Sequence, residues 1–240
     1  MYWMARAFFV VCGVFHRTPF YMKHLVTTVL LLSAATVSVA QTREIYTNAN
    51  FKTLAKDHKI LAILPVKTTL QLRPKEVEKN GGPAGVAVLE KREGLAVQSA
   101  IHSYFLKRKE SNDLTVDVQD IARTNAMLER NAVTYETMGS FTSEELAKIL
   151  NVDGIVSGTF ESTQPMSNGA AVAMSVLVGF GGATNTGKTV ISINDGKTGE
   201  LLWKYDKTLS RGFGSDTGSI ITTIMRKASR QFPYDKDYRD

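Results

Sequence analysis

The feature that most constrains the fold is an uninterrupted apolar run, Ile-Leu-Ala-Ile-Leu-Pro-Val at 60–66, with a lysine on either side. A strand that alternates apolar and polar residues can leave one face in water, whereas a continuously apolar strand must be covered on both faces. Proline donates no ladder hydrogen bond, so Pro65 places the end of this strand nearby. The chain is therefore expected to form a sheet covered by helices, in the α/β to α+β class.

The region after this strand predicts a loop and then a helix. Residues 68–94 contain Arg73-Pro74 and Gly81-Gly82-Pro83, which are typical of turns, and we expect a surface excursion there. From about Leu95 to Phe105 apolar residues recur at helical spacing. This spacing predicts a helix of roughly four turns with one buried face.

Two further helices are indicated by their capping residues. An alternating strand at 114–118 is followed by Asp120, whose carboxylate can accept the first amides of a helix over 121–131. Thr142 and Glu145 then form a capping box, in which each side chain can bond the other residue's amide, ahead of a helix that ends near residue 150.

The C-terminal half predicts mainly strands. We expect strands at 155–160, 170–180, 188–193 and 201–209, and a closing helix at about 216–231. The expected architecture is a mixed β-sheet of about five to six strands covered by helices, with a C-terminal β-meander and a closing helix.

A phosphate-loop pattern is present at 182–189, where the sequence is Gly-Ala-Thr-Asn-Thr-Gly-Lys-Thr. In a nucleotide-binding loop a helix follows, so that its first amides and its dipole meet the phosphate. Here Thr189 is followed by Val-Ile-Ser-Ile and then Asn-Asp-Gly, which predicts a strand that ends in a turn. We therefore expect no nucleotide cofactor, and a nucleotide hydrolase is the less favoured alternative.

The first 40 residues predict an export leader. Met22-Lys23-His24 is followed by a short apolar core at 25–37 and by Ser38-Val39-Ala40, a small-x-small cleavage site. We expect Met22 to be the start codon and 1–40 to be leader and signal peptide. Residues 41–240 would then be a single domain in the periplasm, and the only cysteine, Cys12, would be removed.

Composition argues against several kinds of function. Removing Arg6, Arg17 and Lys23 with the leader leaves 26 basic against 23 acidic residues, a net charge of +3. This charge is too small to indicate nucleic acid binding. His58 and His102 lie 44 positions apart, which is no metal-ligand spacing, and no paired carboxylates or catalytic triad stand out. We predict no catalytic residue, no metal, no cofactor and no small-molecule substrate.

Several segments together resemble one family, the CsgG-like fold group. The similarity covers about residues 59–232, and its most specific pieces are LNVDGIVSG at 150–158 and DGKTGELLW at 195–203, whose Trp203 is expected in the core. The other matching segments are ILAILPV, LAVQSAIHSYFLKR and VDVQDIARTNAMLE. The group includes the curli secretion channel subunit, outer-membrane activators of penicillin-binding proteins and, more remotely, the N-terminal domain of TolB.

The resemblance implies a non-enzymatic secreted envelope protein, a binding, assembly or secretion-accessory factor that acts on an envelope protein partner or by self-association. Outer-membrane members resemble lipoproteins with an acylated N-terminal cysteine. Gln41 stands at that position here, which argues against a lipid anchor and leaves peripheral contact with the outer membrane as an expectation. The alternative is a subunit of an oligomeric outer-membrane secretion pore. That branch uses two membrane hairpins per subunit, and this chain offers one candidate strand of sufficient length, 170–180.

A candidate docking tip follows from the predicted strands. If 170–180 and 188–193 are antiparallel neighbours, Gly181 to Gly187 forms the exposed turn between them. Exposed loop residues often carry binding functions. The predicted docking residues are Phe180, Thr184, Asn185 and Thr186, and the alternative is a passive connector.

Overall fold

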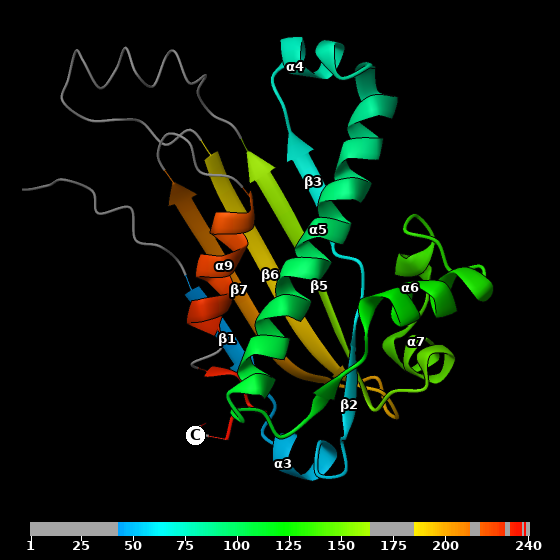
Figure 1. Cartoon of the computed structure of the whole chain (residues 1–240), viewed down its shortest axis with the longest axis vertical. Coiled ribbons are helices and arrows are strands. Elements are labelled where there is room, and N and C mark those ends of the chain that lie inside the picture. The colour runs from blue at the N-terminus through cyan, green and yellow to red at the C-terminus, as the bar shows by residue number, and fades with distance from the viewer. Residues whose placement is uncertain (1–42, 164–184, 212–216, 229–230, 237, 239–240) are drawn as a thin grey trace, which may run out of the picture. The chain divides into compact units, whose positions relative to one another are not determined.

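The computed structural model describes residues 43–163, 185–211, 217–228, 231–236 and 238 (Figure 1). The strands are β1 (Arg43–Thr47), β2 (Ile60–Ile63), β3 (Lys67–Gln71), β4 (Asp117–Val118), β5 (Gly154–Thr163), β6 (Asn185–Asp195) and β7 (Leu201–Arg211). The helices are α3 (Phe51–Leu54), α4 (Pro74–Lys79), α5 (Gly82–Glu110), α6 (Ile121–Arg130), α7 (Ser143–Leu150) and α9 (Thr217–Ala228), with a short 3-10 helix at Met138–Ser140.

All seven strands belong to one mixed sheet. Its order is β1-β7-β6-β5-β2-β4, and β3 pairs with β5 beyond the end of β2. Strands β2 and β3 both run parallel to β5, while β5, β6, β7 and β1 are joined by antiparallel pairs. The predicted mixed sheet, C-terminal meander and closing helix are therefore confirmed.

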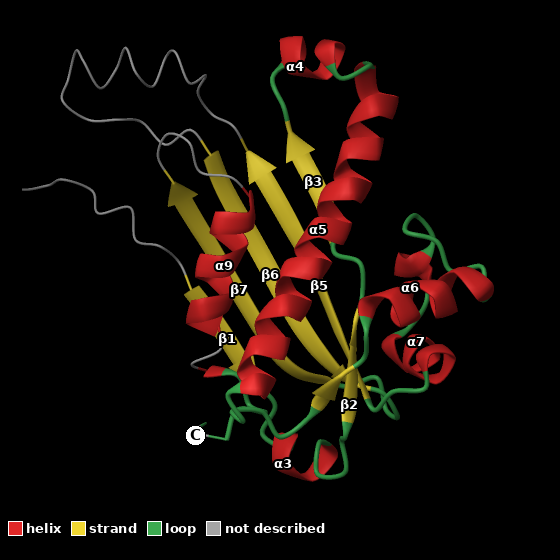
Figure 2. Ribbon diagram, in the orientation of Figure 1, coloured by secondary structure: helices red, strands yellow, loops and turns green. Residues whose placement is uncertain are grey.

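The helices bury the sheet unequally on its two faces. Figure 2 shows α5 and α9 crossing one face, and α6 and α7 beside β2. The main apolar cluster contains Leu61 and Ile63, whereas Ala62 and Leu64 belong to a second cluster with residues of α6 and α7. The apolar run is thus buried on both faces, as its composition predicts.

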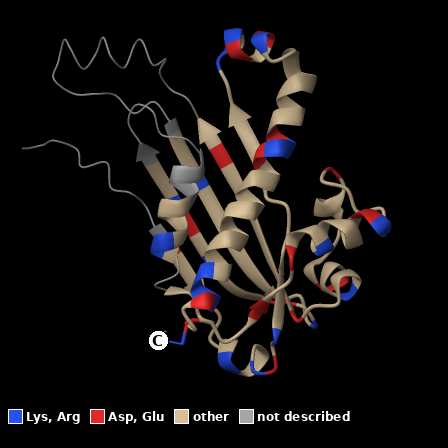
Figure 3. Ribbon diagram, in the orientation of Figure 1, with Lys and Arg blue, Asp and Glu red and all other residues tan. Residues whose placement is uncertain are grey.

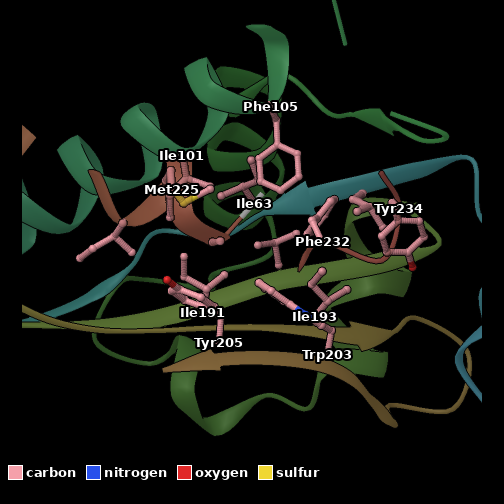
Figure 4. Close-up of a cluster of buried hydrophobic side chains, with 14 of the residues drawn as sticks. Ile63, Ile101, Phe105, Ile191, Ile193, Trp203, Tyr205, Met225, Phe232 and Tyr234 are labelled. Carbon is pink, nitrogen blue, oxygen red and sulfur yellow. The ribbon is translucent and has the colours of Figure 1, made fainter. Parts of the chain in front are cut away.

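The main cluster is rich in aromatic side chains. Figure 4 shows side chains of β6 and β7 meeting those of α5 and the C-terminal segment. Trp203 is 1% exposed; its ring stacks on Tyr205 with centroids 5.9 Å apart and meets Phe232 edge-on at 5.5 Å. The prediction that Trp203 is a core residue is confirmed.

Both predicted helix caps are present. Asp120 accepts hydrogen bonds from the amides of Ala122 and Arg123 at the start of α6. Thr142 accepts the amide of Glu145, whose carboxylate accepts the amide of Thr142, at the start of α7. These bonds satisfy amides that have no partner within the helix.

The prediction for residues 68–94 was wrong. This region contains β3, α4 and the first turns of α5, which is 29 residues long. Gly81-Gly82-Pro83 opens the helix instead of a loop: Gly81 has φ of 86° and Pro83 lies in the first turn, where proline costs no hydrogen bond. The strand expected at 114–118 shortens to β4, and residues 43–54, without a clear pattern in the sequence, form β1 and α3.

Candidate binding groove

The predicted docking tip is only partly described. Phe180 and Thr184 lie outside the described residues, as does the strand predicted at 170–180. Asn185 and Thr186 begin β6 and do not belong to a turn. The strand starts here because its neighbours extend equally far and supply ladder partners: Thr186 lies opposite Thr163 of β5 and Ser210 of β7. A role of these residues in docking stays a prediction.

The phosphate-loop pattern lies largely inside a strand. Lys188 and Thr189 are internal to β6; Lys188 is exposed and lies opposite Glu161, whereas Thr189 is buried. The strand continues to Asp195, which confirms that a strand and not a helix follows the motif. The loop-to-helix geometry that binds phosphate is therefore not formed at this position.

We expect Lys188→Ala to change the free energy of unfolding by less than about 0.5 kcal/mol, as for other surface substitutions. Isothermal titration with Mg-ATP should give the same flat trace for the parent chain and the variant. Saturable binding that the substitution abolishes would contradict this expectation.

A buried histidine cluster joins distant segments. His58 Nδ1 lies 2.6 Å from the Tyr234 hydroxyl, and His58 Nε2 lies 2.7 Å from Asp195 Oδ1. The other Asp195 oxygen accepts the amides of Lys197 and Thr198 and the Thr198 hydroxyl. Burial raises the pKa of Tyr234, with a further contribution from the Asp195 charge. Because both ring nitrogens already have partners, we interpret this cluster as structural.

A more open site is built around Tyr135. Its hydroxyl accepts the Thr68 amide at 2.8 Å and donates to the Val66 carbonyl at 3.1 Å, so it anchors residues 131–141 to the segment between β2 and β3. Burial raises the pKa of the Tyr135 phenol. The Lys67 ammonium lies 4.9 Å from the Tyr135 ring centroid, within cation–π range.

Helix α5 approaches this site at Gly94. The Gly94 carbonyl accepts the Val66 amide at 3.3 Å. A Cβ atom at position 94 would collide with the Val66 carbonyl oxygen and lie 2.9 Å from the Tyr135 ring. Glycine is therefore required for α5 to pass this close to the β2–β3 segment.

Two cavities share Tyr135 as a wall residue. Their volumes are about 360 and 320 Å³, and they share Pro65, Tyr135 and Met138 as walls. The larger is also lined by Lys91, Leu95, Asn125, Leu128, Glu129, Val133 and Thr134; the smaller by Leu64, Lys67, Glu136, Gly139, Phe141, Ser143, Leu146, Ser157 and Gly158. We call this combined depression, defined by these residues, the Tyr135 groove.

The groove lies at a switch point of the sheet. After β2 the chain continues into β3, α4 and α5, which packs on one face, whereas after the adjacent parallel strand β4 it continues into α6, which packs with the second cluster. Ligands of open α/β sheets bind at the carboxyl ends of two neighbouring strands whose following helices lie on opposite faces of the sheet. Pro65, just beyond β2, and Asn125 of α6 both line the larger cavity.

In the described ranges, no group of three or more histidine, cysteine or acidic side chains could hold a metal ion. Of the helices that the structure describes, none has both the length and the apolar character needed to cross a membrane.

The sequence contains no local pattern that predicts the groove, because Pro65, Leu95 and Tyr135 lie in three separate segments that only the fold brings together.

No protein-family model matches the sequence, and no curated protein matches it. Among solved structures, the PelC dodecamer from Paraburkholderia phytofirmans is 12% identical, with a TM-score of 0.43 over 83% of this chain and 99% of PelC. Lipoprotein GNA1162 from Neisseria meningitidis is 11% identical, with a TM-score of 0.41 over 72% of this chain and 96% of that one. The LpoB C-terminal domain from Salmonella enterica is 8% identical, with a TM-score of 0.32 over 67% of this chain and 93% of the LpoB chain. At these values the similarities assign neither a family nor a function.

Proposed function

We propose that this chain is a non-enzymatic envelope protein that binds an extended segment of a partner protein in the Tyr135 groove. The observation that carries the proposal is the pair of cavities that share the half-buried residue Tyr135 as a wall. In an extended peptide every second side chain lies on the same face, so neighbours on that face are residues i and i+2. Two such side chains can straddle Tyr135, one in each cavity.

The walls of the groove suit a polypeptide. Apolar residues line both cavities, and the rim carries charges of both signs, with Lys91 and Glu136 3.7 Å apart. Such a mixed rim favours neither a free anion nor a free cation. Figure 3 shows basic and acidic positions interspersed along the described helices and strands, which does not support nucleic acid as the partner.

The side chain of Asn125, which lines the larger cavity, can form hydrogen bonds with a peptide backbone. Gln98 and Asn125 exchange side-chain hydrogen bonds of 3.0 and 3.1 Å, and Gln98 also donates to the Ile63 carbonyl. A primary amide has two donor hydrogens and two acceptor sites. Asn125 therefore keeps one donor and one acceptor site for a bound backbone, while Gln98 holds its orientation.

A photo-crosslinking experiment with two leucines of α5 tests the proposal. Leu95 is 38% exposed and lines the groove, whereas Leu106 is 45% exposed and does not. With a photoreactive phenylalanine at position 95, we expect a protein adduct in the cell envelope, and at position 106 we expect none. Leu95→Lys should weaken capture by about tenfold or more, since a buried leucine contributes roughly 1.5–3 kcal/mol.

Leu106→Lys is the matched control, because it adds the same charge to the same helix outside the groove. Equal adducts at both positions, or none at either, would contradict the groove as the binding site. A lipid adduct confined to position 95 would retain the site and overturn the class of partner.

A further inference from the structure

The two edges of the sheet differ in how their backbone groups are satisfied. At the β3 edge the Thr68 amide donates to the Tyr135 hydroxyl at 2.8 Å, and the Leu70 amide donates to Glu90 Oε1 at 2.9 Å. These are the amides that an added strand would use. On the same side of the sheet β4, which pairs with β2, is only two residues long. Side-chain caps and short strands are known means of closing an edge.

The opposite edge, β1, lacks such caps in the described part of the chain. The Asn48 amide donates to the Leu202 carbonyl at 2.8 Å, so Asn48 and Leu202 form a hydrogen-bonded pair of the antiparallel β1–β7 ladder. Hydrogen-bonded pairs alternate with non-bonded pairs, so the backbone groups of Ile45 and Thr47 point away from β7. No described residue bonds to these outward groups of Ile45 and Thr47.

We propose that β1 pairs antiparallel with β1 of a second copy of this chain, which joins two sheets into one. In the register centred on Ile45, Ile45 lies opposite Ile45, Arg43 opposite Thr47, and Glu44 opposite Tyr46. No like charges are directly opposed in this arrangement, so the strand is complementary to itself.

The side chains of β1 suit such a junction on both faces. Ile45 packs against the main apolar cluster, so two Ile45 side chains extend that core across the pair. Tyr46 is 48% exposed, lies on the other face of the strand and meets Glu44 of the second copy. An isologous pair uses both β1 edges, and the β3 edges are capped, so the sheet stops at two copies.

The β1 edge is on the opposite side of the sheet from the Tyr135 groove, so this pairing stands or fails independently of the proposed function. The test compares Thr47→Pro with Thr47→Val by sedimentation equilibrium. Proline removes the outward amide but no bond to β7, whereas valine keeps the amide. Both variants lose the contact of the Thr47 hydroxyl with Tyr238.

We expect the parent chain and Thr47→Val to show a monomer–dimer equilibrium, and Thr47→Pro to dimerise at least about tenfold more weakly. Circular dichroism verifies that each variant is folded. Tyr46→Glu is a second variant, since it opposes Glu44 of the other copy with a like charge and should weaken the dimer most at low salt. The proposal would be overturned if the parent chain stayed monomeric at the highest protein concentration measured. It would also be overturned if folded Thr47→Pro and Tyr46→Glu dimerised as strongly as the parent chain.

Discussion

Asp195→Ala should lower the free energy of unfolding by several kcal/mol, because each buried hydrogen-bond donor that loses its acceptor costs about 1–3 kcal/mol. The substitution leaves His58 Nε2 without its partner and removes the acceptor for the backbone of the β6–β7 turn. Urea denaturation measures the loss. Asp57→Ala is the matched control, because Asp57 adjoins His58 in sequence but is exposed, and little change is expected there.

The effect of Asp195 should also depend on pH. Burial alone would raise the pKa of Asp195, but hydrogen bonds from Thr198 and His58 lower it below its ordinary value. A carboxylate with a lowered folded-state pKa stabilises the fold above its unfolded pKa, near 4, and this contribution is lost as the pH falls through the folded value. The stability difference between the parent chain and Asp195→Asn should therefore shrink below about pH 4. A difference that is constant between neutral and acid pH would disprove the assignment of a charged Asp195.

Trp203→Ala should cost about 3–5 kcal/mol, as large-to-small changes at buried aromatic positions do. The side chain is 1% exposed and contacts Tyr205 and Phe232, so alanine would leave a cavity between β7 and the C-terminal segment. Trp203→Phe should cost much less, because the indole N–H has no hydrogen-bond partner among the described residues and its removal breaks no bond. Urea denaturation followed by far-ultraviolet circular dichroism separates the two variants. Equal losses for alanine and phenylalanine would show that the ring is not what stabilises this core.

Local signals predicted the centre of the fold but not its projecting parts. The apolar run at 60–66 and the caps at Asp120 and Thr142 depend on neighbours in sequence, and all three were confirmed. Helix α5 was predicted only from about Leu95. Figure 1 shows its first turns beside α4, away from the strands β6 and β7, and Val88 is 69% exposed. No residue of α5 before Gly94 is buried, so these turns show no apolar periodicity.

The sites were harder to predict because they depend on tertiary contacts. Tyr135 is an isolated aromatic residue in a polar stretch, and its role becomes clear only once it contacts Thr68, 67 positions away. His58 and Tyr234 are 176 positions apart. The predicted docking residues Phe180 and Thr184 lie outside the described ranges, so that prediction is untested.

The position of β5 in the sheet determines the order in which the chain can fold. Strand β2 pairs with β5 through residues about 93 positions away, such as Ile63 with Val156, whereas β6 and β7 follow β5 and pair in sequence. Long-range parallel pairs form slowly, because a large loop must close before they gain any contact. At roughly 5–20 residues per second, synthesis from Ile63 to Val156 takes about 5–20 seconds. During that interval the apolar strand β2 can pair only with the two-residue strand β4, so its protection from aggregation depends on other factors until β5 emerges.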